Sequence, residues 1–252
     1  MLLCVECGNT CVKISVFNDL DVKPLKALRI NTQRDVSSVE YSLRLRSIIG
    51  DKFEINDAII STVVPTLKEK MKEAIKLAFN IDAKVLSKDF YTGIPLDIDN
   101  PSELGLDFIC TAVGVKALGV KPPYAIADFG TCTKISVVDS DGKFIGRFIT
   151  SGLNSELKGL INGCDQLYEV EVAFPNRIIG KNTKDSIQSG ICFGQAFLIE
   201  ETVRRMEQEL GYRLNRFICG GYGGLMHKYV SGFRYEYALS LIGLNEIYKL
   251  NK

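Results

Sequence analysis

Two short segments, about half a chain apart, carry residues suited to binding phosphate and a cation. They are Glu6-Cys7-Gly8-Asn9-Thr10 and Asp128-Phe129-Gly130-Thr131. A glycine turn lets backbone N–H groups point into a small concavity, and a neighbouring amide or hydroxyl adds donors for phosphate oxygens. The acid before each turn offers an oxygen ligand for Mg²⁺, which binds one or two carboxylates beside nucleotide phosphates. The predicted phosphate-binding residues are Gly8, Asn9, Thr10, Gly130 and Thr131, and the predicted metal ligands are Glu6 and Asp128.

The two turns belong to an internal repeat. Each follows an apolar segment and precedes a similar run, Lys13-Ile14-Ser15-Val16 in the first half and Lys134-Ile135-Ser136-Val137 in the second. One acid-x-Gly turn occurs in many ordinary hairpins, but two in register at half-chain spacing indicate a duplicated unit. We therefore predict two lobes with a phosphate-binding cleft. The alternative is a duplicated fold that no longer binds phosphate.

The elements around the turns predict an α/β fold. The runs after both turns alternate in polarity as half-buried strands do, and later segments have helical periodicity. Each lobe is expected to begin with three antiparallel strands followed by α-β-α-β, and Pro122-Pro123 separates lobes 1–121 and 122–252. The predicted strands are 2–5, 13–16, 25–30, 57–61, 84–86, 124–127, 134–137, 144–149 and 217–219, and the predicted helices are 39–49, 66–79, 102–118, 154–163, 183–210 and 235–248.

The composition argues against several classes of protein. The net charge is +1, with 46% hydrophobic and 24% charged residues, so no global field attracts nucleic acid or an anionic membrane. No apolar run approaches the roughly 18 residues of a spanning helix, and the first residues include no basic leader. We expect a packed cytoplasmic protein that binds neither nucleic acid nor membrane. With His227 as its single histidine and no Gly-x-Ser-x-Gly or Walker-type loop, hydrolase triads and P-loop chemistry are disfavoured.

Three cysteines near the start, Cys4, Cys7 and Cys11, have a spacing that could indicate a metal or redox motif. Residues three apart in a strand point to opposite faces, so Cys4 and Cys7 cannot easily converge on one ion. We therefore interpret them as structural thiols.

Six motifs, in order along nearly the whole chain, resemble those of the type III pantothenate kinases. Glu6–Thr10 is similar to Asp-x-Gly-Asn-Thr in that family. The others are 60–65 (Ser-Val-Val-Pro), 100–107 (Asn-Pro-x-x-x-Gly-x-Asp), 128–133 (Asp-x-Gly-Thr-Ala-x-Thr), 179–194 (Gly-x-Asn-Thr, then Gln-x-Gly-x3-Gly) and 219–221 (Thr-Gly-Gly).

The resemblance implies paired ribonuclease-H-like lobes, as in the actin-like ATPases and sugar kinases. It further implies ATP-dependent phosphorylation of pantothenate to 4′-phosphopantothenate, the first step of coenzyme A biosynthesis. Mg²⁺ and a monovalent cation, K⁺ or NH₄⁺, would take part, and the protein would be a homodimer. Asp107 would be the general base, which suits a carboxylate that removes the proton of an attacking hydroxyl. Other matched positions would bind pantothenate (Gly105, Leu106, Asp107, Thr183) or ATP (Gly220, Gly221).

Simpler structural interpretations exist for these matched residues. Asp107 could be a surface acid on a helix, Thr183 a helix N-cap, and Gly220-Gly221 a plain turn. The chain also departs from the family pattern at Glu6, which replaces Asp, and at Phe108 and Ile98, where Arg and Tyr are expected. Arg147 and Ser151 replace Gly and Pro. Two alternative functions follow, a nucleotide- or ligand-binding regulatory relative and a kinase for another small hydroxyl compound.

Overall fold

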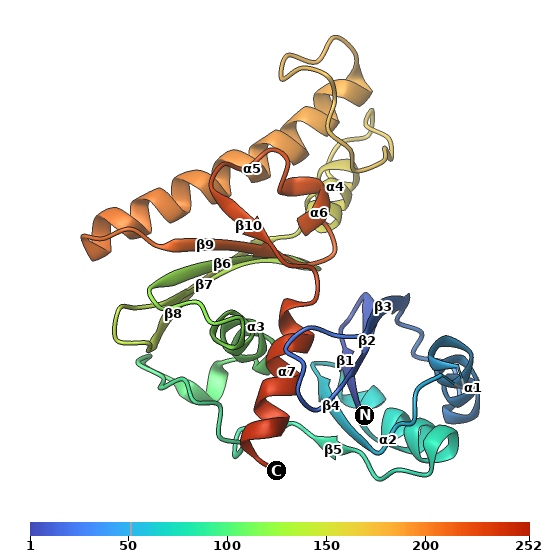
Figure 1. Ribbon diagram of the computed structural model, residues 1–252. Helices are drawn as coiled ribbons and strands as arrows, with labels where there is room; N and C mark the ends of the chain where they lie inside the picture. Colours follow the sequence, from blue (N-terminus) through green and yellow to red (C-terminus); the bar gives the residue numbers. More distant parts are fainter. Residues whose placement is uncertain (51) are drawn as a thin grey trace. The chain divides into compact units, whose positions relative to one another are not determined.

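The computed structural model describes residues 1–50 and 52–252, which form two compact units. One unit contains residues 1–120 and 238–252, and the other contains residues 121–237. Figure 1 shows that each unit has one sheet with helices packed against it. Within the described residues, no helix is both long and apolar enough to cross a membrane.

The sheet of the first unit has the strand order β3-β2-β1-β4-β5. Strand β1 pairs antiparallel with β2 and parallel with β4, so it lies at the centre. The strands are β1 (Leu2–Cys7), β2 (Cys11–Phe17), β3 (Lys26–Asn31), β4 (Asp57–Thr62) and β5 (Lys84–Val85). The helices are α1 (Ser38–Ile49), α2 (Pro65–Phe79), α3 (Leu106–Ala117) and α7 (Leu239–Leu250), with the short 3₁₀ helix η1 (Pro101–Glu103).

The sheet of the second unit has the order β10-β9-β6-β7-β8, the same pattern around its own first strand. Strand β6 pairs antiparallel with β7 and parallel with β9. The strands are β6 (Tyr124–Phe129), β7 (Cys132–Val138), β8 (Phe144–Ser151), β9 (Asn215–Cys219) and β10 (Phe233–Tyr235), and the helices are α4 (Leu153–Asn162), α5 (Thr183–Leu210) and α6 (Gly223–Met226). The predicted α/β fold with a repeated antiparallel start is confirmed.

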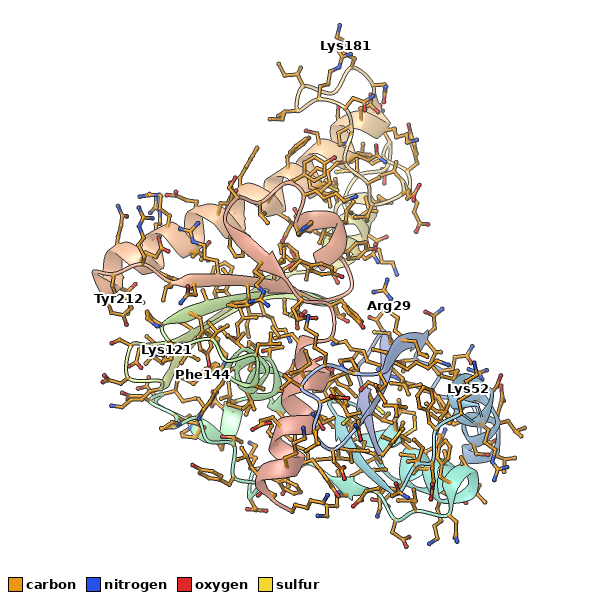
Figure 2. All side chains as sticks on the ribbon, viewed as in Figure 1. Arg29, Lys52, Lys121, Phe144, Lys181 and Tyr212 are labelled. Carbon is orange, nitrogen blue, oxygen red and sulfur yellow. The ribbon has the colours of Figure 1, made fainter. Side chains whose placement is uncertain are left out.

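Alternation along β1 decides which helices each side chain meets. Leu3, Val5 and Cys7 pack in one apolar core with residues of α1 and α2, while Cys4 and Glu6 point to the other face, which α3 and α7 cover (Figure 1). Cys4 and Cys7 are thus on opposite faces, as predicted. Side chains fill the layers of both units (Figure 2), and the labelled Phe144 is fully buried.

Local residues set the helix ends. The Ser37 hydroxyl accepts a hydrogen bond from the backbone N–H of Glu40 and caps α1. Helix α2 starts at Pro65, whose missing N–H costs nothing at a first position, and ends at Asn80 in the left-handed conformation. Helix α5 ends at Gly211, which also adopts the left-handed conformation.

Helices α3 and α7 cross with their backbones in direct contact. A Cβ at Gly243 of α7 would lie 2.7 Å from the carbonyl carbon of Cys110 and 2.8 Å from the backbone nitrogen of Gly114, both in α3. A Cβ at Gly114 would in turn lie 3.1 Å from the carbonyl carbon of Leu239. This crossing places the C-terminal helix in the first unit, whereas the predicted lobe 122–252 groups it with the second half.

Two predicted helices begin later than expected. Within the predicted helix 102–118, Asn100 caps the 3₁₀ turn η1, and extended backbone at Leu104 and Gly105 delays α3 until Leu106. The predicted helix 235–248 begins only at Leu239, because residues 233–235 pair with β9 as strand β10. The short helix α6 was not predicted.

Candidate functional site

The first predicted turn joins β1 and β2 and is held by Thr32, the residue that follows β3. The backbone N–H of Gly8 donates to the carbonyl of Cys11 over 3.0 Å. Thr32 holds the turn from outside, since its hydroxyl donates to the Gly8 carbonyl over 2.7 Å and its N–H donates to the Thr10 carbonyl over 3.0 Å. The side chains of Asn9 and Thr10 are exposed. The turn therefore presents polar groups on a braced backbone.

Glu6, in front of this turn, belongs to a three-membered network. Lys13 lies opposite it in the β1–β2 register, and its Nζ is 3.1 Å from Oε2 and 3.3 Å from Oε1 of the carboxylate. Ser240 of α7 accepts a hydrogen bond from Lys13 over 3.1 Å and donates one to Glu6 Oε2. The Glu6 side chain is 12% exposed. This carboxylate is thus charge-balanced and only partly open to solvent.

Asp107 lies in the first turn of α3, and its surroundings connect it with Glu6. A Cβ at Gly105, the N-cap residue, would overlap the Oδ1 oxygen of Asp107, so the carboxylate folds back over the start of the helix. Burial raises the pKa of the Cys110 thiol well above its usual range, and the nearby negative charges of Glu6 and Asp107 raise it further. Both carboxylates therefore act on the same buried thiol.

The residues beside Asp107 are less polar than the family pattern implies. Phe108 is only 7% exposed, while Leu106 and Ile98 are half-buried. The aromatic ring of Phe108 packs close to Gly105, with Cδ2 3.5 Å from the position of a Cβ there. Position 108 therefore contributes to the core instead of presenting a charge.

The second turn joins β6 and β7 and has the same plan. Asp128 faces Lys134 in the strand register, with 3.3 Å between Oδ2 and Nζ, and its side chain is 15% exposed. The N–H of Gly130 donates to the carbonyl of Cys132 over 3.1 Å. Gly152, the N-cap of α4, packs so closely that a Cβ would lie 2.6 Å from the Gly130 carbonyl oxygen. A helix N-terminus, which attracts anions, thus borders this turn.

The Gly220-Gly221 segment is brought directly to the second turn. Gly220 has φ +93°, and a Cβ there would lie 2.6 Å from the backbone nitrogen of Phe129 and overlap the Asp128 carboxylate. The N–H of Tyr222 donates to the Phe129 carbonyl over 3.0 Å. Only glycine allows this approach, so the packing of the segment on the second turn requires Gly220. The second unit therefore joins Asp128, Gly130, Gly152 and Gly220 in one place.

Thr183 is exposed and occupies the first position of α5. The N-cap is Asn182, whose Oδ1 accepts the N–H of Asp185 over 2.8 Å, so Thr183 does not cap the helix. Figure 2 shows the neighbouring Lys181 at the outer end of the loop before α5. The structure does not bring Thr183 to the second turn.

Four residues that contribute to the turns were not identified in that role from the sequence. Ser240 is distant from Glu6 in the chain and has no local signal. Gly152 follows β8, and its role depends on how it packs against the second turn, which the sequence pattern does not show. The lysines Lys13 and Lys134 belonged to the repeated run, but that run did not reveal their ion pairs with the acids.

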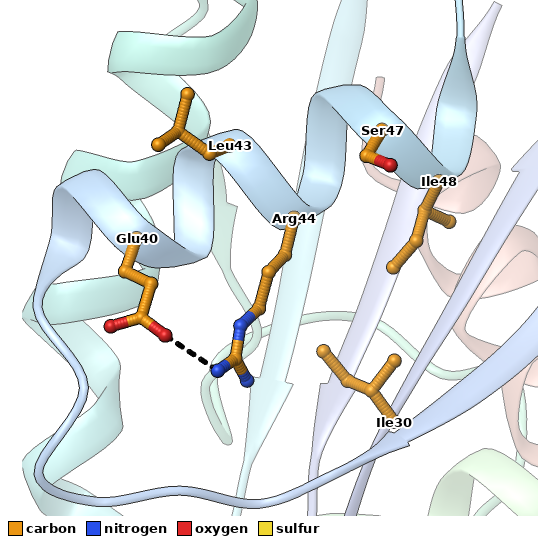
Figure 3. Close-up of a pocket in the computed structure, with 6 residues that line it drawn as sticks. All are labelled: Ile30, Glu40, Leu43, Arg44, Ser47 and Ile48. Atoms are coloured by element: carbon orange, nitrogen blue, oxygen red, sulfur yellow. Dashed lines mark hydrogen bonds and ion pairs between the residues drawn. The ribbon is translucent and has the colours of Figure 1, made fainter.

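A surface hollow of about 410 Å³ lies elsewhere, between α1 and β3 (Figure 3). The Glu40–Arg44 ion pair, 2.6 Å between oxygen and nitrogen, closes one side of it. It contains none of the predicted site residues; its lining consists of Ile30, Glu40, Leu43, Arg44, Ser47 and Ile48. Across residues 1–50 and 52–252, no cluster of three His, Cys, Asp or Glu side chains is arranged to hold a metal ion.

Comparison with known proteins assigns the chain to a family. The family model for type III pantothenate kinases matches residues 2–205. The chain belongs to the type III pantothenate kinase family. Type III pantothenate kinases from Frankia alni and Roseiflexus sp. (strain RS-1) are 32% and 33% identical to it, over 252 and 258 aligned residues that cover 100% of both proteins in each pair. Membership in this family makes the chain an ATP-using kinase that acts on a small molecule.

A solved structure supports the fold of this family member. A candidate 2-dehydro-3-deoxygalactonokinase from Sinorhizobium meliloti superposes with a TM-score of 0.59 at 11% identity, covering 99% of this chain and 96% of that one. At this identity the likeness concerns the fold alone. It agrees with the predicted pair of ribonuclease-H-like lobes.

Proposed function

We propose that this protein transfers the γ-phosphoryl group of ATP to the primary hydroxyl of pantothenate, forming 4′-phosphopantothenate in the first step of coenzyme A biosynthesis. The observation that carries the proposal is the full-length match to curated type III pantothenate kinases. Both repeated turns lie within the aligned length, so the match includes the residues that phosphoryl transfer would need.

Asp107 is the proposed general base. Phosphoryl transfer requires little covalent chemistry from the protein, so positioning and electrostatics dominate, and a carboxylate beside the acceptor hydroxyl takes its proton. Asp107 meets this need because Gly105, which has no side chain, leaves space for its carboxylate at the start of α3. It is also partly exposed, which leaves it accessible to a substrate.

The two turns are the proposed phosphate-binding residues. In the first, Gly8, Asn9 and Thr10 offer an exposed amide and hydroxyl on a backbone that Thr32 holds in place. In the second, Gly130 and Thr131 adjoin the N-terminus of α4, whose dipole favours negative charge. Gly220 and Gly221 would let the backbone approach the adenosine part of ATP, since no side chain intervenes.

Glu6 and Asp128 are the proposed Mg²⁺ ligands, and K⁺ or NH₄⁺ is the proposed monovalent cation. Both carboxylates fit Mg²⁺ in chemistry, because each is partly exposed and presents oxygen atoms beside a predicted phosphate turn. When bound, Mg²⁺ would neutralise negative charge on the phosphates. Lys13 and Lys134 each form an ion pair with the acid opposite them and leave its side chain partly exposed.

Gly105, Leu106, Asp107 and Thr183 are the proposed pantothenate-binding residues. The first three are consecutive at the start of α3, where they can contact one ligand together. The exposed hydroxyl of Thr183 is available to a polar group of a ligand, since Asn182 already caps the helix.

The test is direct. Purified protein incubated with ATP, Mg²⁺, K⁺ and pantothenate should form 4′-phosphopantothenate, detected by mass spectrometry. Asp107→Asn should lower kcat by about 100-fold or more, because it removes the base and keeps the shape. Product formation that is unchanged in Asp107→Asn would contradict the role of Asp107, and binding of ATP without product would contradict turnover.

Burial of Phe108 favours a second candidate, a kinase for another small hydroxyl compound. The family pattern has Arg at this position, and a phenylalanine that is 7% exposed cannot supply a charged donor to the carboxylate of pantothenate. ATP consumption with a different acceptor, measured across a panel of small alcohols, would support this candidate.

We also propose that the protein acts as a homodimer. An aromatic cluster beside α5 supports this, because Phe174 stacks on Tyr229 at 3.4 Å between ring centroids while Phe197 (48%) and Tyr229 (42%) stay exposed. Light scattering should give about twice the mass of 28.0 kDa. A monomeric mass at micromolar concentration would contradict the proposal. The cytoplasmic location stays a prediction from the sequence.

A further inference from the structure

We propose that Ser240, on the C-terminal helix, is a positioning residue that orients the Glu6 carboxylate toward the bound nucleotide. The inference rests on the proposed nucleotide site at the first turn and extends that site to a helix 234 positions away in sequence. Ser240 would act through Glu6 and touch no substrate.

The direction of the hydrogen bonds around Ser240 supports this role. Its hydroxyl accepts a hydrogen bond from Lys13 over 3.1 Å, which uses a lone pair and leaves its one hydrogen for Glu6 Oε2. Lys13 also contacts both carboxylate oxygens. Ser240 therefore holds one particular oxygen of the pair, whereas Lys13 alone would attract both almost equally.

The longer side chain of glutamate explains why such a contact is useful. Glu6 has one more rotatable bond than Asp128, its counterpart in the second unit, so its carboxylate must lose more rotamer freedom to stay fixed. The two units fix their acids in different ways. The backbone at Gly220 packs against the Asp128 carboxylate, and a serine hydroxyl holds Glu6.

Main-chain contacts fix the position of Ser240 itself. It lies in the first turn of α7, between Leu239, which approaches Gly114, and Gly243, which approaches Cys110. The side chain is buried, with 5% exposure. A hydroxyl carried on a helix that is anchored in this way can impose an orientation on its partner.

The experiment measures ATP binding by calorimetry without pantothenate, once with Mg²⁺ and once with EDTA. Ser240→Ala should weaken ATP binding in Mg²⁺ by about tenfold, the effect of losing a hydrogen bond to a charged group, and should change it much less in EDTA. Ser42→Ala is the matched control, because Ser42 is similarly buried and its hydroxyl donates to the backbone carbonyl of Val39 in its own helix. It should bind ATP like the wild type.

A double-mutant cycle separates positioning from general loss of packing. In a Glu6→Gln background, Ser240→Ala should have little further effect, because both substitutions break the same interaction. Ser240→Thr keeps the hydroxyl and should bind ATP within about threefold of the wild type. An unchanged affinity in Ser240→Ala, or a full tenfold effect added to Glu6→Gln, would overturn the proposal.

The two proposals can fail independently. If the wild type binds MgATP but does not phosphorylate pantothenate, the proposed substrate is wrong. The double-mutant cycle of ATP affinities still tests the role of Ser240. If pantothenate is phosphorylated and Ser240→Ala binds MgATP normally, only the inference about Ser240 is wrong.

Discussion

Replacing Gly243 with alanine should destabilise the protein by about 2 kcal/mol, although alanine is the better helix former. The new Cβ would lie 2.7 Å from the Cys110 carbonyl carbon and 2.8 Å from the Gly114 nitrogen. These are main-chain atoms of a neighbouring helix, so no side-chain rotation relieves the overlap. Alanine in a helix gains about 1 kcal/mol over glycine, and overpacking a tight contact costs about 1–3 kcal/mol, sometimes more. Because the backbones collide, we expect an overpacking cost of about 3 kcal/mol, the upper end of that range, which leaves a net loss of about 2 kcal/mol.

The assay is thermal unfolding of the full chain. A loss of about 2 kcal/mol should lower Tm by about 4–8 °C for a protein of this size. Gly159→Ala in α4 is the control, since a Cβ there would meet nothing within 4 Å beyond its own chain neighbours and helix backbone, and it should raise stability by about 0.5–1 kcal/mol. If Gly243→Ala is as stable as the wild type, or gains stability like Gly159→Ala, then α3 and α7 do not cross at these glycines.

Two further substitutions test the second unit. Burial raises the pKa of Glu207, but hydrogen bonds led by that from Arg216 outweigh burial and hold the pKa below its ordinary value. The resulting stabilisation is present above the unfolded-state pKa and is lost as pH falls through the folded-state pKa. Glu207→Gln should therefore lower Tm at pH 7 by several degrees, and this loss should shrink as the pH falls through the acidic range in which the Glu207 carboxylate takes up its proton. An equal loss of Tm at pH 7 and in that acidic range would contradict this. Gly220→Ala should raise the KM for ATP about tenfold or more, because its positive φ and the contact with Asp128 exclude a side chain; unchanged ATP kinetics would show that this segment does not shape the nucleotide site.

The sequence predicted the repeated part of the fold well, because local patterns encode it. The strand pairs on either side of Gly8 and Gly130 follow from alternating polarity, and α1, α2 and α5 have clear capping residues. Helix α3 was predicted to start too early, because a separate 3₁₀ turn at Pro101–Glu103 and extended backbone at Leu104 and Gly105 precede it. Strand β10 was missed because three residues are too few to show alternation.

The site was predictable where a residue acts beside its neighbours in the chain. Glu6 and Asp128 stand in front of their turns as expected, with lysines opposite them. Ser240 and Gly152 could not be predicted, because their roles come from long-range packing on turns that lie far away in sequence. Thr183 matches the family motif for substrate binding, but its position in the fold does not point to the same contact. Its role therefore stays a prediction.

The contacts of α7 have a consequence for how the chain is made. Because residues 238–252 complete the unit that residues 1–120 begin, the face of α3 that packs against α7 stays uncovered until residues 238–252 have been synthesised. All of the second unit leaves the ribosome before the first can close, which reverses the usual order in which N-terminal domains fold first. Truncation of the last helix should therefore leave a protein whose first half stays open and prone to aggregate, however well its own strands pair.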